Sequence, residues 1–150
     1  MLKKRLFFFL LAATFVVAGC GQPSLKLVKA EFAESVKGLN DYVAAKKTTF
    51  KSGETLNVYV QVQGFQSNSD GDKFTSWPME TIKVRDNKGK LIFTQKVFSD
   101  MKTYDEKQTE FALPFQVTLT GEKGPYRIEG IVEDGITGER LTFELGLTLE

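Results

Sequence analysis

The sequence predicts an all-β domain, an antiparallel sandwich of about seven short strands. Apolar residues recur at every second position in several stretches, which is the period of a half-buried strand. Short segments rich in Gly, Asp and Asn separate these stretches, as expected of turns. No alternation of strand and helix patterns appears, so βαβ units are not expected. Closely spaced short strands are typical of a sandwich or barrel.

Three stretches carry the strongest alternation: "TLNVYVQVQGF", "TEFALPFQVTL" and "LTFELGLTL". The apolar face expected in each comprises, in turn, Leu56, Val58, Val60 and Val62; Phe111, Leu113, Phe115, Val117 and Leu119; and Leu141, Phe143, Leu145, Leu147 and Leu149. Pro114 lies on the opposite face of the second stretch. Because proline has no N–H to donate, it predicts an edge strand or a bulge there.

Weaker alternation predicts strands over residues 81–85, 90–98 and 126–132, joined by turns such as "DNKG" and "DGITG". Residues 25–43 are ambiguous, because their apolar residues fit both a helical stripe and an alternating strand. We favour a strand over residues 27–34 followed by a loop. That strand completes the count of seven.

The front of the chain has the features of a targeting segment. Lys3, Lys4 and Arg5 precede an apolar run over residues 6–17. That run is shorter than the ~20 residues that a membrane-spanning helix needs, and it fits the apolar region of a signal peptide. Small residues and a single cysteine follow. A lone thiol is unexpected in an exported chain, where cysteines usually pair.

Val17, Ala18, Gly19 and Cys20 resemble the lipobox of bacterial lipoproteins. The resemblance implies a signal peptide over residues 1–19, a diacylglycerol on the Cys20 thiol and a fatty acyl group such as palmitate on its new amino group. Residues 20–26 would then be the lipidated cysteine and a short tether. Gly21, which is not Asp, implies the outer membrane in a Gram-negative cell and otherwise the outer face of the cytoplasmic membrane. The alternative is an ordinary secretory signal with a chance cysteine.

The rest of the chain, residues 27–150, resembles bacterial immunoglobulin-like or fibronectin-III-like sandwiches. The likeness rests on "FKSGETLNVYVQVQGF" and on "GPYRIEGIVEDGITGERLTFEL", which has the form of a final hairpin. Such domains mostly bind, space or scaffold other molecules. The chain lacks the cysteine pair of antibody domains, and Trp77, beside Pro78, is not equated with their core tryptophan. Tyr126 is expected to form a tyrosine-corner-like hydrogen bond to the backbone.

Composition excludes several classes of function. Cleavage before Cys20 leaves 150 − 19 = 131 residues, enough for one domain. Without Lys3, Lys4 and Arg5, 17 Lys+Arg face 19 Asp+Glu, so the net charge is −2 and a nucleic-acid partner is not expected. The sequence has no histidine, which excludes Ser-His-Asp and Cys-His catalysis and His-containing zinc sites. No cofactor is expected beyond the lipid on Cys20.

Acidic residues suggest two further sites, each with a simpler alternative. Asp70 and Asp72 are weak candidates for Ca²⁺ ligands, but their spacing does not match an EF-hand and a plain polar loop is favoured. The sequence cluster Asp100, Asp105, Glu106 and Glu110 contains enough carboxylates for glycoside hydrolysis. Solvated linker residues are the favoured interpretation.

Aromatic residues in or near loops are candidates for binding: Phe65, Phe74, Trp77 and Tyr104. On an exposed rim they would stack on sugars or anchor a protein partner. We favour the alternative, that they are buried and close the end of the sandwich. Tyr59 interrupts the polar face of its strand, so it is expected to be covered by residues 35–50 or to contact a partner.

These features predict a non-catalytic lipoprotein of the cell envelope, anchored in the membrane through Cys20 and used for interaction with another envelope protein. A module that binds carbohydrate or another envelope polymer is the alternative. A hydrolase that uses carboxylates alone is the third and weakest hypothesis.

Overall fold

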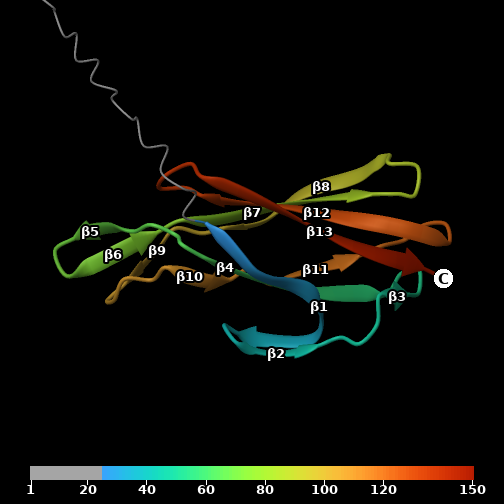
Figure 1. Ribbon diagram of the computed structural model, residues 1–150, viewed down its shortest axis with the longest axis horizontal. Helices are drawn as coiled ribbons and strands as arrows, with labels where there is room; N and C mark the ends of the chain where they lie inside the picture. Colours follow the sequence, from blue (N-terminus) through green and yellow to red (C-terminus); the bar gives the residue numbers. More distant parts are fainter. Residues whose placement is uncertain (1–24) are drawn as a thin grey trace, which may run out of the picture.

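The computed structural model describes residues 25–150, which form strands, turns and loops and contain no helix (Figure 1). The thirteen strands in this part of the chain are β1 (Lys26–Gly38), β2 (Asp41–Ala44), β3 (Thr49–Phe50), β4 (Thr55–Gln63), β5 (Asn68–Asp70), β6 (Lys73–Ser76), β7 (Pro78–Arg85), β8 (Leu91–Ser99), β9 (Lys102–Tyr104), β10 (Glu110–Ala112), β11 (Phe115–Thr118), β12 (Gly124–Asp134) and β13 (Arg140–Leu149). The described residues therefore contain no helix that could cross a membrane.

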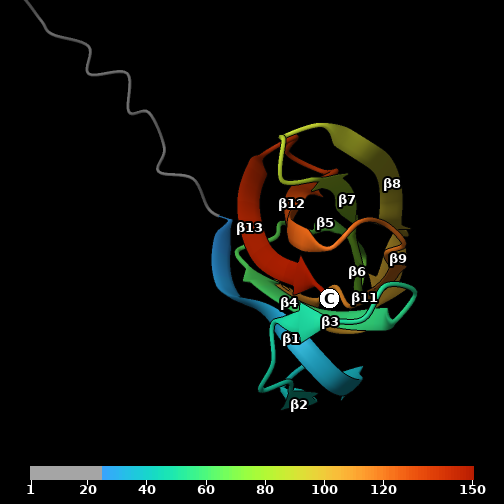
Figure 2. The same ribbon diagram turned by 90° about the vertical axis from the view of Figure 1, so that its right-hand side faces the viewer.

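Two five-stranded sheets enclose a common apolar core (Figure 2). The first has the order β10-β4-β1-β2, with β11 also paired to β4, and the second has the order β3-β13-β12-β7-β8. All pairings are antiparallel except that of β3 with β13. A third, small sheet has the order β5-β6-β9. The all-β class predicted from the sequence is confirmed.

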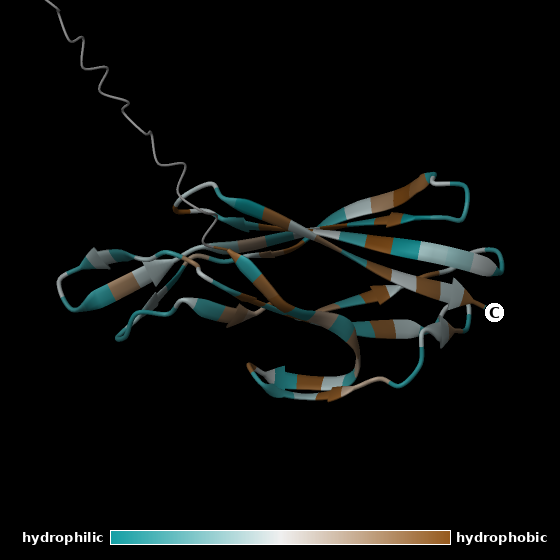
Figure 3. Ribbon diagram, in the orientation of Figure 1, coloured by the Kyte–Doolittle hydropathy of each residue, from teal (hydrophilic) through white to brown (hydrophobic). Residues whose placement is uncertain are grey.

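The predicted alternation places the core residues as expected. Leu56, Val58, Val60 and Val62 on β4 are all buried between the two sheets. Phe115 and Val117 on β11 and Phe143, Leu147 and Leu149 on β13 join the same cluster. Figure 3 shows the resulting alternation of polar and apolar residues along the long strands. Burial of one face of each strand thus follows from the period-2 pattern.

Thirteen strands are observed within residues 25–150 where about seven were expected, and many of the additional strands are short. β5, β6 and β9 have three or four residues each and come from polar sequence without a long alternating run. β2 and β3 have four and two residues. β2 and β5 pair with the next or preceding strand through a short turn, whereas β3 and β9 pair with strands that are distant in the sequence, which a local pattern does not reveal.

Residues 25–43 form a strand, as favoured, but the strand is longer than predicted. β1 continues to Gly38, and β2 takes the place of part of the expected loop. The register of β1 with β2 shifts between Ala33 and Ser35 and again between Val36 and Gly38. Each bulge changes which face the following residues occupy, so the apolar spacing resembles that of a helix.

The bulges also redirect β1. Its first half pairs with β4 up to Ala33, and its second half leaves β4 and pairs with β2. We call residues 35–44 the arm. In Figure 2, β2 lies beyond β1 and β4, on the side away from β12 and β13. Asn40 at its turn has φ 60, a left-handed conformation that asparagine tolerates better than most residues.

β10 and β11 behave as one edge strand that crosses Pro114. Their register against β4 runs without a shift from Glu110 opposite Gln63 to Thr118 opposite Thr55. The N–H of Leu113 donates to the carbonyl of Val60 at 2.8 Å, which links the two parts. Of the two predicted settings for Pro114, the edge is therefore the one observed.

The predicted tyrosine-corner-like bond is present. The Tyr126 hydroxyl donates to the carbonyl of Glu122 at 3.0 Å. We expect Tyr126→Phe to lower the free energy of unfolding by about 1 kcal/mol, because one hydrogen bond is lost with little change in packing. Urea denaturation measures the loss. Tyr104→Phe is the control, since no hydrogen bond of its hydroxyl is seen within residues 25–150. An equal loss in both variants would contradict the assignment.

Candidate binding groove

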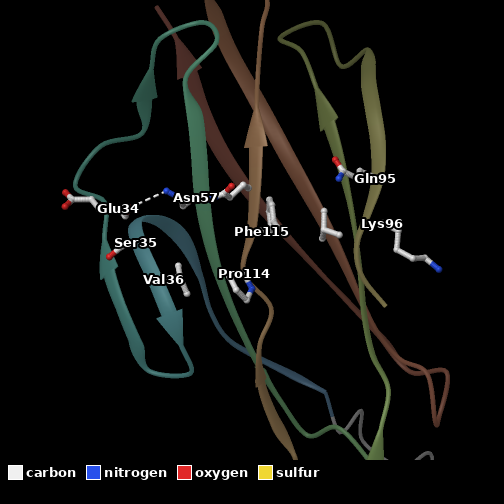
Figure 4. Close-up of a pocket in the computed structure, with 10 residues that line it drawn as sticks. Glu34, Ser35, Val36, Asn57, Gln95, Lys96, Pro114 and Phe115 are labelled. Carbon is white, nitrogen blue, oxygen red and sulfur yellow. Dashed lines mark hydrogen bonds between the residues drawn. The ribbon is translucent and has the colours of Figure 1, made fainter. Parts of the chain in front are cut away.

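An open groove of about 670 Å³ lies beside the edge strand β11. In Figure 4, Pro114 and Phe115 lie between the arm on one side and β8 on the other. The arm side contributes residues 34–36, and β8 contributes residues 95–97. We call this hollow the edge groove. Its volume lies within the range of ligand-binding sites.

A smaller hollow of about 350 Å³ continues past Pro114. Val36 and Pro114 line both hollows, so the groove extends along the edge from β11 to β10. Tyr104 and Phe111 lie at this end, with ring centroids 6.0 Å apart. Partial burial raises the pKa of the Tyr104 phenol. This end of the groove is therefore more aromatic than the first.

The backbone of β11 faces the groove with hydrogen-bonding groups that no other described strand uses. Because the N–H of Leu113 points toward β4, the alternation of an antiparallel ladder directs the N–H groups of Gln116 and Thr118 away from β4. Pro114 occupies the preceding outward position, where its missing N–H costs no ladder bond. Within residues 25–150, no strand pairs with this outer edge of β11.

Side-chain amides dominate the polar lining. Gln116 Nε2 donates to Asn57 Oδ1 at 2.8 Å, and Asn57 Nδ2 donates to the carbonyl of Glu34 at 3.4 Å (Figure 4). Gln95 and Lys96 line the β8 side. Amides and a lysine recognise carbonyls, N–H groups and carboxylates. The polar part of the lining therefore offers hydrogen-bond donors and acceptors to a bound molecule.

The arm is held over β4 by an aromatic stack. The rings of Tyr42 and Tyr59 lie 3.8 Å apart and nearly parallel, and Tyr59 is fully buried. Of the two settings predicted for Tyr59, coverage by residues 35–50 is the one observed. Tyr42 also donates to Glu31 and accepts from Lys29 Nζ at 2.7 Å, a bond that raises the pKa of the Lys29 ammonium.

A buried hydrogen-bond network ties the arm to the edge strand. The Tyr59 hydroxyl accepts from the backbone N–H of Asn40 at 3.0 Å and donates to Gln61 Oε1 at 3.0 Å. Gln61 Nε2 donates to Asn40 Oδ1 at 3.1 Å and to Glu110 Oε1 at 2.7 Å. The arm wall of the edge groove is thus held to β4 and β10 by named polar contacts.

The predicted aromatic candidates do not share one exposed rim. Phe65 is fully buried, and its ring meets Phe111 edge-on at 5.2 Å. Phe74 and Tyr104 are half-buried partners across β6 and β9. Trp77 is half-buried, and its ring lies so close to Gly135 that a Cβ there would be 2.5 Å away. Of the four, Tyr104 lines the groove.

The acidic candidates are separated as well. Asp70 and Asp72 flank Gly71 at the exposed turn between β5 and β6, and residues 25–150 contain no group of three or more potential metal ligands. Asp105 pairs with Lys73, whereas Glu110 belongs to the network below the arm. The lipobox residues Val17, Ala18, Gly19 and Cys20 lie outside the described residues.

Glu80 is a residue of interest that the sequence analysis missed. It lies on β7 between Phe98 of β8 and Val132 of β12 and is 1% exposed, and neither carboxyl oxygen has a hydrogen-bond partner among residues 25–150. Burial raises the pKa of its carboxyl to about 8. The available signal in the sequence was that Glu80 lies two residues before Ile82, and therefore on the same face of the strand. The buried Asp134 differs, because it accepts the N–H groups of Gln66 and Ile136 at 2.8 and 2.9 Å.

Comparison with known proteins identifies no family. No family model and no curated protein matches the chain. Among solved structures, the sporulation control protein Spo0M of Bacillus subtilis is similar with a TM-score of 0.46 and 14% identity over 85% of this chain. A β-glucosidase of Listeria innocua in complex with isofagomine is similar with a TM-score of 0.43 and 12% identity over 85% of this chain. The aligned region spans 49% and 16% of those chains. Likeness at this level carries no argument about activity.

Proposed function

We propose that this chain is a lipid-anchored module of the bacterial cell envelope that binds another envelope protein and has no catalytic role. The observation that carries the binding function is the edge groove, in which a strand edge left unpaired by residues 25–150 lies beside a polar-lined hollow. The lipobox-like residues 17–20 support the anchor. Two or more acyl chains at one residue suffice for stable attachment to a membrane.

An immunoglobulin-like ancestry for the sandwich is part of this proposal. The β12–β13 hairpin pairs over ten residue positions, and the bond from Tyr126 to the backbone resembles a tyrosine corner. The arm and the β5-β6-β9 sheet would be additions to that plan. The arm forms one wall of the groove, so the additions contribute to the proposed binding site.

The proposed anchor would hold one end of the domain close to the membrane. Five Cα–Cα steps separate Cys20 from Leu25, and each spans at most ~3.6 Å, so the tether reaches at most about 18 Å. Leu25 is buried, and its N–H donates to Glu139 Oε1 at 3.0 Å. The loop that contains Glu139 would therefore lie near the lipid surface.

Cys20→Ser tests the anchor. We expect the wild-type chain to be found with membranes and to carry lipid at Cys20, because cysteine is the acylated residue of a lipobox. The variant should lose the lipid and leave the membrane fraction after a salt wash. Intact-mass spectrometry and fractionation in the native host measure both. An unlipidated wild-type chain, or a variant that stays with the membrane, would contradict the anchor.

In-cell photocrosslinking tests the binding function. A photoreactive residue at Gln95, which lines the groove, should capture one discrete envelope protein. The same residue at Thr142, exposed on β13 in the other sheet, is the matched control and should not. Equal capture from both positions, or none from Gln95, would count against the groove as the binding site.

A carbohydrate-binding role is the second candidate. It rests on the far end of the groove, where Tyr104 and Phe111 lie beside Gln108 and Glu110. Aromatic rings with neighbouring hydrogen-bonding groups suit a sugar face. Capture of glycan in place of protein, lost on Tyr104→Ala and kept on Trp77→Ala, would favour this role.

A further inference from the structure

We propose that the partner binds as an extended segment that adds a strand to the free edge of residues 110–118, between the arm and β8. This inference rests on the proposed protein-binding function and specifies the binding mode and the kind of partner. The segment would be a peptide with alternating polar and apolar side chains, whose backbone pairs with β11. Strand addition of this kind obtains affinity from main-chain hydrogen bonds and specificity from alternate side chains.

The edge offers hydrogen-bonding groups in a regular row. Gln116 and Thr118 direct their N–H groups outward, and Pro114, Gln116 and Thr118 direct their carbonyls outward by the same alternation. Residues 110–118 are long enough for several ladder bonds, since a strand rises ~3.3 Å per residue. Pro114 removes one donor in the middle and leaves the acceptors in place.

β8, the edge strand of the second sheet, also borders the groove, but it is poorly suited to pair with an added strand. β8 contains two register shifts against β7, between the partners of Glu80 and Thr81 and between those of Val84 and Arg85. Bulges twist an edge away from a second strand, and Lys96 adds a charge on the same segment. β11 has no register shift against β4. The regular edge is therefore the one that lies along the floor of the groove.

The walls of the groove suit the two faces of an added strand. On one side, Asn57 and Ser35 present polar groups, and on the other the half-buried Val97 presents apolar surface beside Lys96. Lys96 forms no ion pair within residues 25–150. A segment with polar residues toward the arm, apolar residues toward β8 and a carboxylate near Lys96 fits this lining.

The test uses the full-length lipidated protein in dodecyl maltoside micelles and a phage-displayed library of random linear dodecapeptides. Selected peptides are synthesised, and their Kd values are measured against the wild type, Gln116→Pro and Gln116→Ala. Gln116→Pro removes the outward N–H at a position equivalent to that of Pro114. Gln116→Ala removes the side-chain amide and keeps the N–H, so it is the matched control.

We expect Gln116→Pro to weaken peptide binding about tenfold, the effect of one lost hydrogen bond of ~1.4 kcal/mol, and Gln116→Ala to weaken it much less. Hydrogen exchange of the wild type is the second measurement and needs no variant. A bound peptide should slow exchange at the Gln116 and Thr118 amides. Unchanged binding by a folded Gln116→Pro, exchange protection elsewhere, or the selection of no peptide would overturn the proposal.

Failure of the binding mode can be told apart from failure of the proposed function. Capture of a partner at Gln95 in cells, together with unchanged peptide binding by Gln116→Pro, would reject strand addition and leave the protein-binding function in place. Absence of any protein captured at Gln95 would reject the function itself, whatever the peptides do.

Discussion

Glu80→Gln is expected to stabilise the protein by about 3 kcal/mol at pH 7, since each pH unit between the pKa values of the two states is worth ~1.4 kcal/mol. The buried carboxyl of the wild type has a pKa of about 8 in the folded state against an ordinary value of 4.5. The folded chain must therefore hold a proton that the unfolded chain releases. The amide has about the same shape and no charge, so this cost disappears.

The direction in which the free energy of unfolding changes with pH follows from the two pKa values of Glu80. Below pH 4.5 the carboxyl is protonated in both states and contributes no pH dependence. From there to about pH 8, the free energy of unfolding of the wild type should fall as the pH rises, and above pH 8 it should level off. Burial is the sole cause of the raised pKa of Glu80, because no charged neighbour contributes to it.

Guanidinium denaturation between pH 5 and 8.5 measures the effect. The gap in unfolding free energy between Glu80→Gln and the wild type should widen with pH. Glu144→Gln, on an exposed position of β13, is the control and should leave the pH dependence of the wild type unchanged. Parallel curves for the wild type and Glu80→Gln would show that Glu80 has an ordinary pKa in the folded protein.

Tyr59→Ala is expected to lower the free energy of unfolding by about 3–5 kcal/mol, the range for removing a buried aromatic side chain. The ring is fully buried against Tyr42, and its hydroxyl joins Asn40 to Gln61. Tyr59→Phe keeps the ring and should lose only about 1–3 kcal/mol, because buried polar partners are left unpaired.

The place where amide exchange accelerates distinguishes the loss of this hydroxyl's hydrogen bonds from a general loss of packing. In Tyr59→Phe, amide exchange should accelerate first in the arm, residues 35–44, since its ties to β4 run through this hydroxyl. β12 and β13 should keep wild-type exchange. Uniform acceleration across both sheets, or no acceleration in the arm, would contradict the role assigned to Tyr59.

The parts of the fold with a clear local pattern were predictable. Period-2 alternation identified β4, β11 and β13, together with the residues that face the core, because a strand buried on one face imposes that period. Pro114 indicated an edge because its chemistry permits few other places in a sheet. Tyr126 and its backbone bond followed from resemblance to a known hairpin.

The parts set by distant contacts were not predictable. The bulges in β1 change its apolar period, so the residues of the arm resemble a helix or a loop. The groove lies between the arm, β8 and β11, three segments separated in sequence, and its floor is backbone that carries no side-chain signal. Glu80 was missed because a charged residue in an alternating strand is normally assigned to the solvent face.

The parallel pairing of β3 with β13 has a consequence for folding kinetics. It joins Thr49 to Thr148 and Phe50 to Leu149, residues about a hundred positions apart, whereas β12 and β13 meet through one short connection. Closure of a long loop costs entropy before its contacts form, so the hairpin should form early and this pairing late. A chain dominated by such non-local pairings is expected to refold in milliseconds to seconds, which is slow for its size.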